Sequence, residues 1–264
     1  RPDPSQKERQ MTARPARRAL FAATAALTLA GPAAAFDVTA MTQEERTAFR
    51  SEIREYLLEN PEVLMEAIAV LEDRQAAAQA ANDTALIRAN ADALFEDEHS
   101  WVGGNPDGDV TIVEFSDYRC SYCRRAFPEV EELLSSDGNI RFILKELPIL
   151  GEQSVISSRF AIATRRVAGD AAYKQVHDAL ITLRGDATEA ALTAIAEDLG
   201  LDADAILVEM STPEVDRIIA ENRALAQRLQ INGTPSFVMG DQMYRGYLPL
   251  AAMREVVAGI RADG

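Results

Sequence analysis

The hydrophobic positions between residues 42 and 95 follow helical spacing. Thr42 and Glu45 form a capping-box pair, and apolar residues recur every three or four positions after them. The first helix should end near Asn60, and Pro61 then suits the first position of a second helix. The apolar residues are Phe49, Ile53, Tyr56, Leu57, Val63, Leu64, Ile68, Leu71, Leu86, Ile87, Leu94 and Phe95. Helices without a strand do not readily close a core, so this stripe should pack on another copy of the chain or, alternatively, on the following domain.

The pattern changes after residues 103–108, which are rich in glycine and other turn-forming residues. Apolar, β-branched runs over 110–115 and 140–144 predict two buried strands, and residues 121–135 between them predict a helix. Residues 152–229 are helical in pattern, with a last helix opening at Thr212-Pro213. Residues 236–245 predict a hairpin, and Pro249 opens a final helix. We therefore expect an α/β domain over residues 99–264 with a parallel βαβ unit and a helical insertion at about 152–229, after an N-terminal helical segment over 36–98.

Residues 11–35 have the three regions of a secretory signal peptide: three arginines, an uncharged run from Ala19 to Ala30, and three alanines over 33–35. Gly31-Pro32 ends the uncharged run short of the roughly 20 residues of a spanning helix, so a membrane anchor is the less favoured alternative. We expect cleavage before Phe36 and a periplasmic location. Residues 1–10 are interpreted as an upstream extension.

Charge and composition exclude two classes of protein. The chain of 264 residues contains 27 Lys and Arg against 42 Asp and Glu, a formal charge of −15, and no basic stretch. Such a surface repels phosphate backbones, so nucleic acid is not an expected partner. Two cysteines and two histidines are too few for a four-ligand structural zinc site. No cofactor is expected, and the cysteines are best interpreted by their reactivity.

Cys120 and Cys123 are spaced as a CxxC pair where the first strand of the βαβ unit passes into a helix. Residues i and i+3 lie on one helix face, where a disulfide can form. Unpaired backbone N–H groups and the helix dipole stabilise a thiolate at Cys120, and Arg119 and Arg124 could add positive charge. Cys120 is thus the expected nucleophile, and Cys123 the thiol that resolves a mixed disulfide.

Two other interpretations remain open for the cysteine pair. A static disulfide, or two buried thiols, would stabilise the fold only modestly because the closed loop is so small. Copper(I) binding by two thiolates is also possible, although His99 and His177 are not spaced to complete a metal site with them. The βαβ context in an exported protein favours redox activity.

The order of strand, CxxC, inserted helices and then Gly233-Thr234-Pro235-Ser236-Phe237 resembles the DsbA family of thioredoxin-fold thiol–disulfide oxidoreductases. The resemblance covers residues 105–264. It implies that Thr234-Pro235 carries a cis proline that faces the CxxC pair, and it adds Thr234 and Pro235 to the expected catalytic site. A proline there leaves neighbouring backbone groups free to pair with a substrate strand.

The resemblance also implies roles for two charged residues. Glu114 matches the family's buried acid under the active site, and Lys145 resembles its usual partner. Such a pair could carry the proton that Cys123 gains or loses. The chain departs from the family's strong oxidases, which often have Pro-His between the cysteines, because Ser121-Tyr122 provides no histidine to stabilise the thiolate.

The helical N-terminal segment together with a DsbA-like domain resembles exported, oligomeric members such as the trimeric ScsC-type proteins. The resemblance implies a homo-oligomer joined by the N-terminal helices, client proteins with cysteines, and a membrane redox partner that recycles the site. Several sites around one client favour isomerisation or reduction, whereas an oxidase needs a single encounter. The alternative from another class is a structural or copper(I)-binding envelope protein that uses the fold as a scaffold.

Overall fold

The computed structural model describes residues 38–263, so the signal-peptide prediction lies outside the described residues. The chain divides into two compact units, one ending at Glu66 and the other beginning at Ala67. The elements are η1 (Val38–Ala40), α1 (Gln43–Glu59), α2 (Glu62–Ala89), α3 (Ala91–Phe95), β1 (Trp101–Gly104), β2 (Val110–Ser116), α4 (Ser121–Asp137), β3 (Ile140–Glu146), α5 (Glu152–Thr182), α6 (Glu189–Asp198), α7 (Ala203–Glu209), α8 (Pro213–Arg228), β4 (Ser236–Met239), β5 (Gln242–Arg245) and α9 (Leu250–Asp263).

The first unit contains η1, α1 and the start of α2. The predicted capping box at Thr42 is present, since its side chain accepts from the Glu45 N–H and the Glu45 carboxylate accepts from the Thr42 N–H at 2.8 Å. Asn60 ends α1, and α2 begins two residues later. No residue of α1 is buried, so its apolar side chains have not found a core within this unit.

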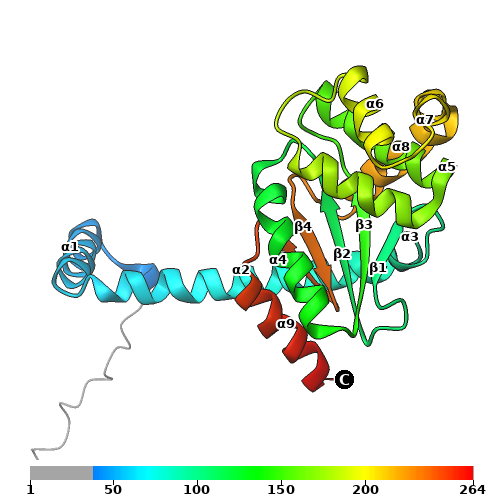
Figure 1. The fold of residues 1–264 in the computed structure, drawn as a ribbon. Coiled ribbons are helices and arrows are strands. Elements are labelled where there is room, and N and C mark those ends of the chain that lie inside the picture. Colours follow the sequence, from blue (N-terminus) through cyan, green and yellow to red (C-terminus); the bar gives the residue numbers. More distant parts are fainter. Residues whose placement is uncertain (1–37, 264) are drawn as a thin grey trace, which may run out of the picture. The chain divides into compact units, whose positions relative to one another are not determined.

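The second unit is built on a mixed five-stranded sheet with the order β1-β3-β2-β4-β5. β2 and β3 are parallel and joined by α4, which confirms the predicted βαβ unit, and the β4–β5 hairpin is antiparallel. Helices α5 to α8 form the insertion and lie together at one end of the sheet (Figure 1). The sequence pattern does not predict β1, because the Gly103-Gly104 pair in this strand is typical of a turn.

Both faces of the sheet are covered by helices. On one face Ile112 and Leu144 pack in a core with residues of α4, α5 and α9. On the other face Val113 and Ile143 pack with residues of α2, α3 and α8. Successive residues of a strand point to opposite faces, so the continuous apolar runs of β2 and β3 serve both cores. None of the described helices combines the length and hydrophobicity needed to cross a bilayer.

The end of α2 belongs to the second unit, which differs from the expected division at residue 98. Leu94 is fully buried and Ile87 nearly so. Asp83 on α2 pairs with Arg245 on β5 through two hydrogen bonds of 2.7 and 2.8 Å. These contacts pack residues 83–95 on the sheet rather than on another copy of the chain.

Candidate active site at the start of helix α4

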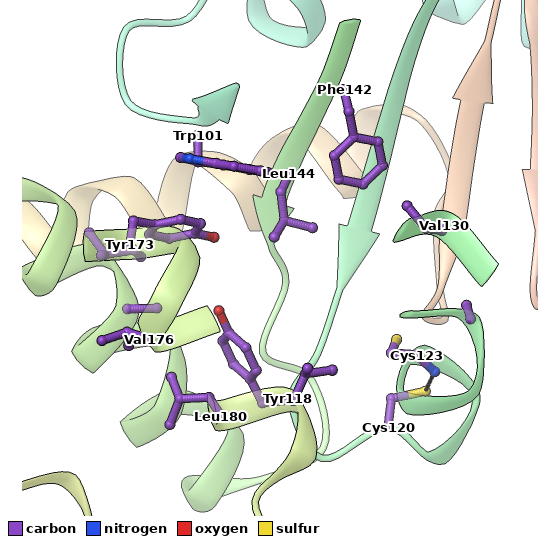
Figure 2. Packing of buried hydrophobic residues seen from close by; sticks show 14 of the residues in the cluster. Trp101, Tyr118, Cys120, Cys123, Val130, Phe142, Leu144, Tyr173, Val176 and Leu180 are labelled. Carbon is purple, nitrogen blue, oxygen red and sulfur yellow. Dashed lines mark hydrogen bonds between the residues drawn. The ribbon is translucent and has the colours of Figure 1, made fainter. Parts of the chain in front are cut away.

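Cys120 is the N-cap of α4 and therefore has its side chain beside unpaired backbone N–H groups. Its Sγ accepts a hydrogen bond from the Cys123 N–H at 3.4 Å, and Figure 2 shows the two sulfur atoms close together at this helix end. Both cysteines are free thiols. Cys120 is 6% exposed and Cys123 is 1% exposed, so Cys120 is the more accessible sulfur of a largely buried pair.

The two thiols differ strongly in acidity. Hydrogen bonding from the Cys123 side chain, and then from Thr234 and the N–H groups of Cys123 and Tyr122, lowers the pKa of Cys120 to about 5. Burial raises the pKa of Cys123, and its hydrogen bond to Cys120 raises it further. At neutral pH the pair therefore holds one thiolate, on Cys120, and one thiol.

The start of β4 faces this helix end. The peptide bond between Thr234 and Pro235 is cis, and the Cys120 Sγ lies 3.1 Å from the Thr234 carbonyl oxygen. The Thr234 Oγ1 is buried beside Cys120, and no other described residue forms a hydrogen bond with it. It is therefore free to donate to a Cys120 thiolate. The structure thus brings together Cys120, Cys123, Thr234 and Pro235.

Glu114 lies on the sheet face below Cys123. It is 6% exposed, and burial, together with the negative charges of Cys120, Glu146 and Glu131, raises its pKa to about 7. Glu114 and Cys123 line one internal cavity of about 10 Å³, close to the least volume that holds a water molecule. The acid is thus placed where a proton from Cys123 could reach it.

Lys145 does not pair with Glu114, which corrects the sequence-based expectation. In the β2–β3 register Glu114 lies opposite Leu144 and Lys145 lies opposite Phe115, so the two charged side chains point to opposite faces. Lys145 is fully buried and forms an ion pair with Asp97 and a 3.1 Å hydrogen bond to Ser100 Oγ. It secures the segment before β1 and takes no part in the cysteine site.

The arginines beside the cysteines are also engaged elsewhere. Arg119 donates to the Gly185 carbonyl and pairs with Asp186 at 3.5 Å. Arg124 donates to the Tyr118 carbonyl at 2.9 Å. Neither arginine is among the main groups that lower the pKa of Cys120. Hydrogen bonds at the helix start, rather than these positive charges, stabilise the thiolate.

A buried polar network adjoins the site, and the sequence pattern did not predict it. Glu146 accepts hydrogen bonds from Tyr118 at 2.8 Å, Tyr173 at 2.6 Å and Ser158 at 2.8 Å. The Tyr118 hydroxyl also lies 3.0 Å from His177 Nδ1. The one sequence feature that could have indicated this network is Glu146 itself, a second charged residue directly after Lys145 at the end of an apolar strand. The network joins the loop before Cys120 to insertion helix α5.

The aromatic residues near the motif mostly belong to the core. Phe115 and Tyr118 are buried, and Phe127 is partly buried against the same core. Tyr122, between the cysteines, is 57% exposed. It is therefore the member of this set that is exposed to solvent.

The described residues contain no group of three His, Cys, Asp or Glu side chains arranged to hold a metal ion. Any metal at the cysteine pair would therefore have two thiolate ligands from this part of the chain.

Comparison with known proteins agrees with this geometry. The DSBA-like thioredoxin domain family matches residues 111–258, and the N-terminal domain of the copper resistance protein ScsC matches residues 45–78. A thioredoxin-like oxidoreductase from Silicibacter pomeroyi DSS-3 is 43% identical, with a TM-score of 0.61, covering 65% of this chain and 97% of its own. ScsC from Proteus mirabilis is 26% identical, with a TM-score of 0.61, covering 86% and 99%.

Similarity also extends to a part of some membrane proteins. The Na⁺/H⁺ antiporter NhaA 1 of Salinispora arenicola is 31% identical over 157 residues, which are 59% of this chain and 24% of the antiporter. The chain thus spans about a quarter of the length of that relative. The family match over residues 111–258 includes both cysteines and Pro235, and the chain belongs to the DSBA-like thioredoxin domain family.

Proposed function

We propose that the chain is an exported protein thiol–disulfide oxidoreductase that exchanges disulfides with client cysteines through Cys120 and Cys123. One observation carries the proposal: a thiol with a pKa of about 5 lies at a helix start beside a second thiol whose pKa is raised. A static pair has no use for this difference. The sulfur that attacks a client and later leaves it needs a low pKa. The resolving sulfur stays protonated until it attacks the mixed disulfide.

In the oxidising direction, a client thiolate attacks Cys120 Sγ of the disulfide form. The Cys120–Cys123 bond breaks, a client–Cys120 disulfide forms, and Cys123 leaves as a thiolate that takes up a proton. A second client thiolate then attacks the client sulfur of this mixed disulfide and releases the Cys120 thiolate. The client loses two electrons and the chain gains them.

The roles of the surrounding residues follow from their positions. Glu114 exchanges the Cys123 proton, because both line the same cavity and the pKa of Glu114 is near neutrality. The Thr234 hydroxyl stabilises the Cys120 thiolate. The backbone beside Pro235, whose Thr234 carbonyl lies 3.1 Å from Cys120 Sγ, pairs with the client strand.

Isomerisation or reduction is the favoured cellular direction. The exposed apolar side chains of α1 and α2 support a homo-oligomer, which would hold several cysteine pairs around one client. The match of residues 45–78 to the ScsC N-terminal domain supports the same arrangement. A membrane redox partner would return the site to its working state.

The test is recovery of activity by a test protein with scrambled disulfides, in a mild thiol buffer, using the chain from Phe36 onward. Wild type should restore activity, Cys120→Ser should abolish the reaction, and Cys123→Ser should accumulate mixed disulfides with the client. A wild type that oxidises a reduced client but leaves the scrambled one inactive would identify an oxidase. Failure of both reactions would refute the redox function.

Copper(I) binding is a second candidate, because two thiols lie together and the N-terminal match is to a copper resistance protein. Titration of the reduced chain with copper(I) against a competing chelator tests it. Binding of one ion that is lost in both Cys120→Ser and Cys123→Ser would support the candidate. Wild type that cannot compete with the chelator would exclude it.

A further inference from the structure

Glu146, the last residue of β3, has a buried carboxylate that accepts three hydrogen bonds from hydroxyl groups. Tyr118 and Tyr173 donate to its Oε1 at 2.8 and 2.6 Å, and Ser158 donates to its Oε2 at 2.8 Å. In Figure 2 the hydroxyl groups of Tyr118 and Tyr173 point toward one another. Burial raises the pKa of Glu146 to about 7 despite these bonds, and the negative charge of Asp117 adds to the rise. The carboxyl therefore gains or loses a proton near neutral pH.

The Tyr118 hydroxyl links Glu146 to the imidazole ring of His177. Its oxygen lies 3.0 Å from His177 Nδ1. A hydroxyl has one proton, and Tyr118 gives it to Glu146 when the carboxylate is charged, so His177 must then donate through Nδ1–H. In that tautomer Nε2 carries the lone pair. When Glu146 is protonated and donates to Tyr118, the direction reverses: Tyr118 donates to Nδ1, and Nε2 carries the hydrogen. The protonation of Glu146 thus determines the tautomer of His177.

His177 also lines the cavity of about 10 Å³ that Cys123 and Glu114 share. Its Nδ1 is occupied by Tyr118, and its Nε2 forms no hydrogen bond with a residue in the part of the chain that the structure describes. Nε2 is therefore the ring atom available to a water molecule in the cavity. One such water would complete a hydrogen-bonded chain from the resolving thiol and Glu114 to Glu146.

The groups that face His177 keep its ring neutral. Burial, and then the positive charge of Lys174, lowers the pKa of His177 to about 3. Glu131, which also lines the cavity, pairs with this lysine at 3.1 Å. Burial raises the pKa of Tyr118 well above its ordinary value. Because neither ring takes a charge, a proton passes along the chain only if each group gives one proton as it receives another.

We propose that Glu146 is a second proton store for Cys123. The inference rests on the proposed function and adds residues to its proton-transfer step. When Cys123 leaves the disulfide as a thiolate, it takes the proton of Glu114. Glu146 then gives its proton to Tyr118, and Tyr118 gives its own to His177 Nδ1. The Nε2 proton of His177 passes through the cavity water to Glu114. These transfers restore the Glu114 carboxyl and leave Glu146 ionised, and no electrons move in them.

The first measurement is the ¹⁵N NMR spectrum of His177 in the disulfide form of the full chain, from about pH 5 to about pH 9. In wild type the ring hydrogen should move from Nε2 to Nδ1 as the pH rises through about 7. Glu146→Gln and Tyr118→Phe should each hold one tautomer throughout, because the first cannot ionise and the second has no hydroxyl. Tyr173→Phe is the matched control. It also removes a hydroxyl from Glu146 Oε1 but does not bond to Nδ1, so it should keep the exchange.

The second measurement is the rate at which reduced glutathione opens the disulfide, expressed per glutathione thiolate. Glu146→Gln and Tyr118→Phe should react about tenfold more slowly than wild type near pH 8, less than the roughly hundredfold loss of a directly placed acid. The difference should vanish at about pH 5, because Glu114, with a pKa of about 7, is already protonated there. Tyr173→Phe should stay within about twofold of wild type at both pH values.

Two outcomes would overturn the inference. A tautomer of wild-type His177 that does not respond to pH would disconnect the ring from Glu146, and this result decides if the variants do not fold. Equal slowing of the Glu146→Gln and Tyr118→Phe variants at both pH values would mean that the network only supports the loop before the cysteines. A wild type that reacts with glutathione but fails either test refutes the inference alone, whereas no reaction with glutathione refutes the proposed function.

Discussion

The difference in acidity between Cys120 and Cys123 comes from the first turn of α4. The sequence predicted the low pKa of Cys120 from the helix start, and the structure supports it through hydrogen bonds from Cys123 and Thr234. Thr234 lies 114 positions along the chain from Cys120, and its approach depends on the antiparallel pairing of β2 with β4. Local spacing therefore predicted the reactive pair, whereas its electrostatic surroundings required the tertiary fold.

We expect the reduced chain to react with iodoacetamide in a single step with a midpoint near pH 5, at Cys120 alone. Below this pH the thiolate is protonated and the rate falls. Mass spectrometry after alkylation across a pH series measures the midpoint and the site. Cys123→Ala should raise the midpoint, because the side-chain hydrogen bond that lowers the pKa most is lost. A midpoint near the ordinary value of about 8.5 would contradict this account.

Glu114→Gln should stabilise the fold at alkaline pH. The folded pKa of about 7 lies above the ordinary value of 4.5, so the carboxyl is protonated in both states at low pH, and it increasingly opposes folding as the pH rises from 4.5 through 7. Urea unfolding should show the variant more stable than wild type at pH 8, by up to about 3 kcal/mol, and nearly equal at pH 4. The exposed Glu132→Gln is the control. A gain independent of pH would rule out this cause.

The alternation of side chains along β2 and β3 explains which of the contacts implied by the family resemblance are absent from the structure. The distance of Glu114 from Cys120 in the chain predicts an acid near the cysteine pair, and Glu114 lines the same cavity as Cys123. Its pairing with Lys145 was wrong, because the parallel register places these residues on opposite faces, and register depends on contacts between strands. The Glu146 network could not be predicted for the same reason, since its partners come from the loop before α4 and from α5.

The ion pair between α2 and β5 should contribute measurably to stability. Asp83 is 4% exposed and accepts two hydrogen bonds from Arg245, so Arg245→Met leaves a buried carboxylate without its cation. We expect a loss of about 3 kcal/mol in the free energy of unfolding, measured by urea denaturation. Arg254→Met breaks an exposed pair with Glu132 and should cost less than about 1 kcal/mol. Equal effects of the two variants would contradict a stabilising role for this contact.

The apolar side chains of α1 and α2 fall into two groups, one buried in the fold of the chain and one exposed on its surface. Ile87 is buried against the sheet. Ile53 on α1 and Ile68 on α2 are 43% and 47% exposed. The hydrophobic periodicity predicted the helices but could not distinguish buried from exposed positions. An apolar stripe has the same spacing whether it packs on its own domain or on another copy of the chain.

A double variant, Ile53→Glu/Ile68→Glu, should shift the chain from oligomer to monomer in sedimentation equilibrium. Charges on the exposed stripe would be buried in the interface and would oppose association. The rate at which a scrambled client is refolded should fall as the oligomer dissociates. The rate of reaction of the cysteine pair with glutathione should stay unchanged, because the variant does not alter that pair. Val208→Glu, at a position 73% exposed on α7, is the matched control. A wild-type chain that sediments as a monomer would contradict the proposed homo-oligomer.

The unequal acidity of the two sulfurs also determines how the protein responds to the pH of its compartment. Since Cys120 has already lost its proton at neutral pH, closing the disulfide releases one proton from the sulfurs together with two electrons. The midpoint potential should therefore change by about 30 mV per pH unit near neutrality, half the value for a pair of ordinary thiols. Equilibration with glutathione at several pH values measures this slope. Acidification would then make this site a weaker oxidant, relative to clients with two protonated thiols, than it is at neutral pH.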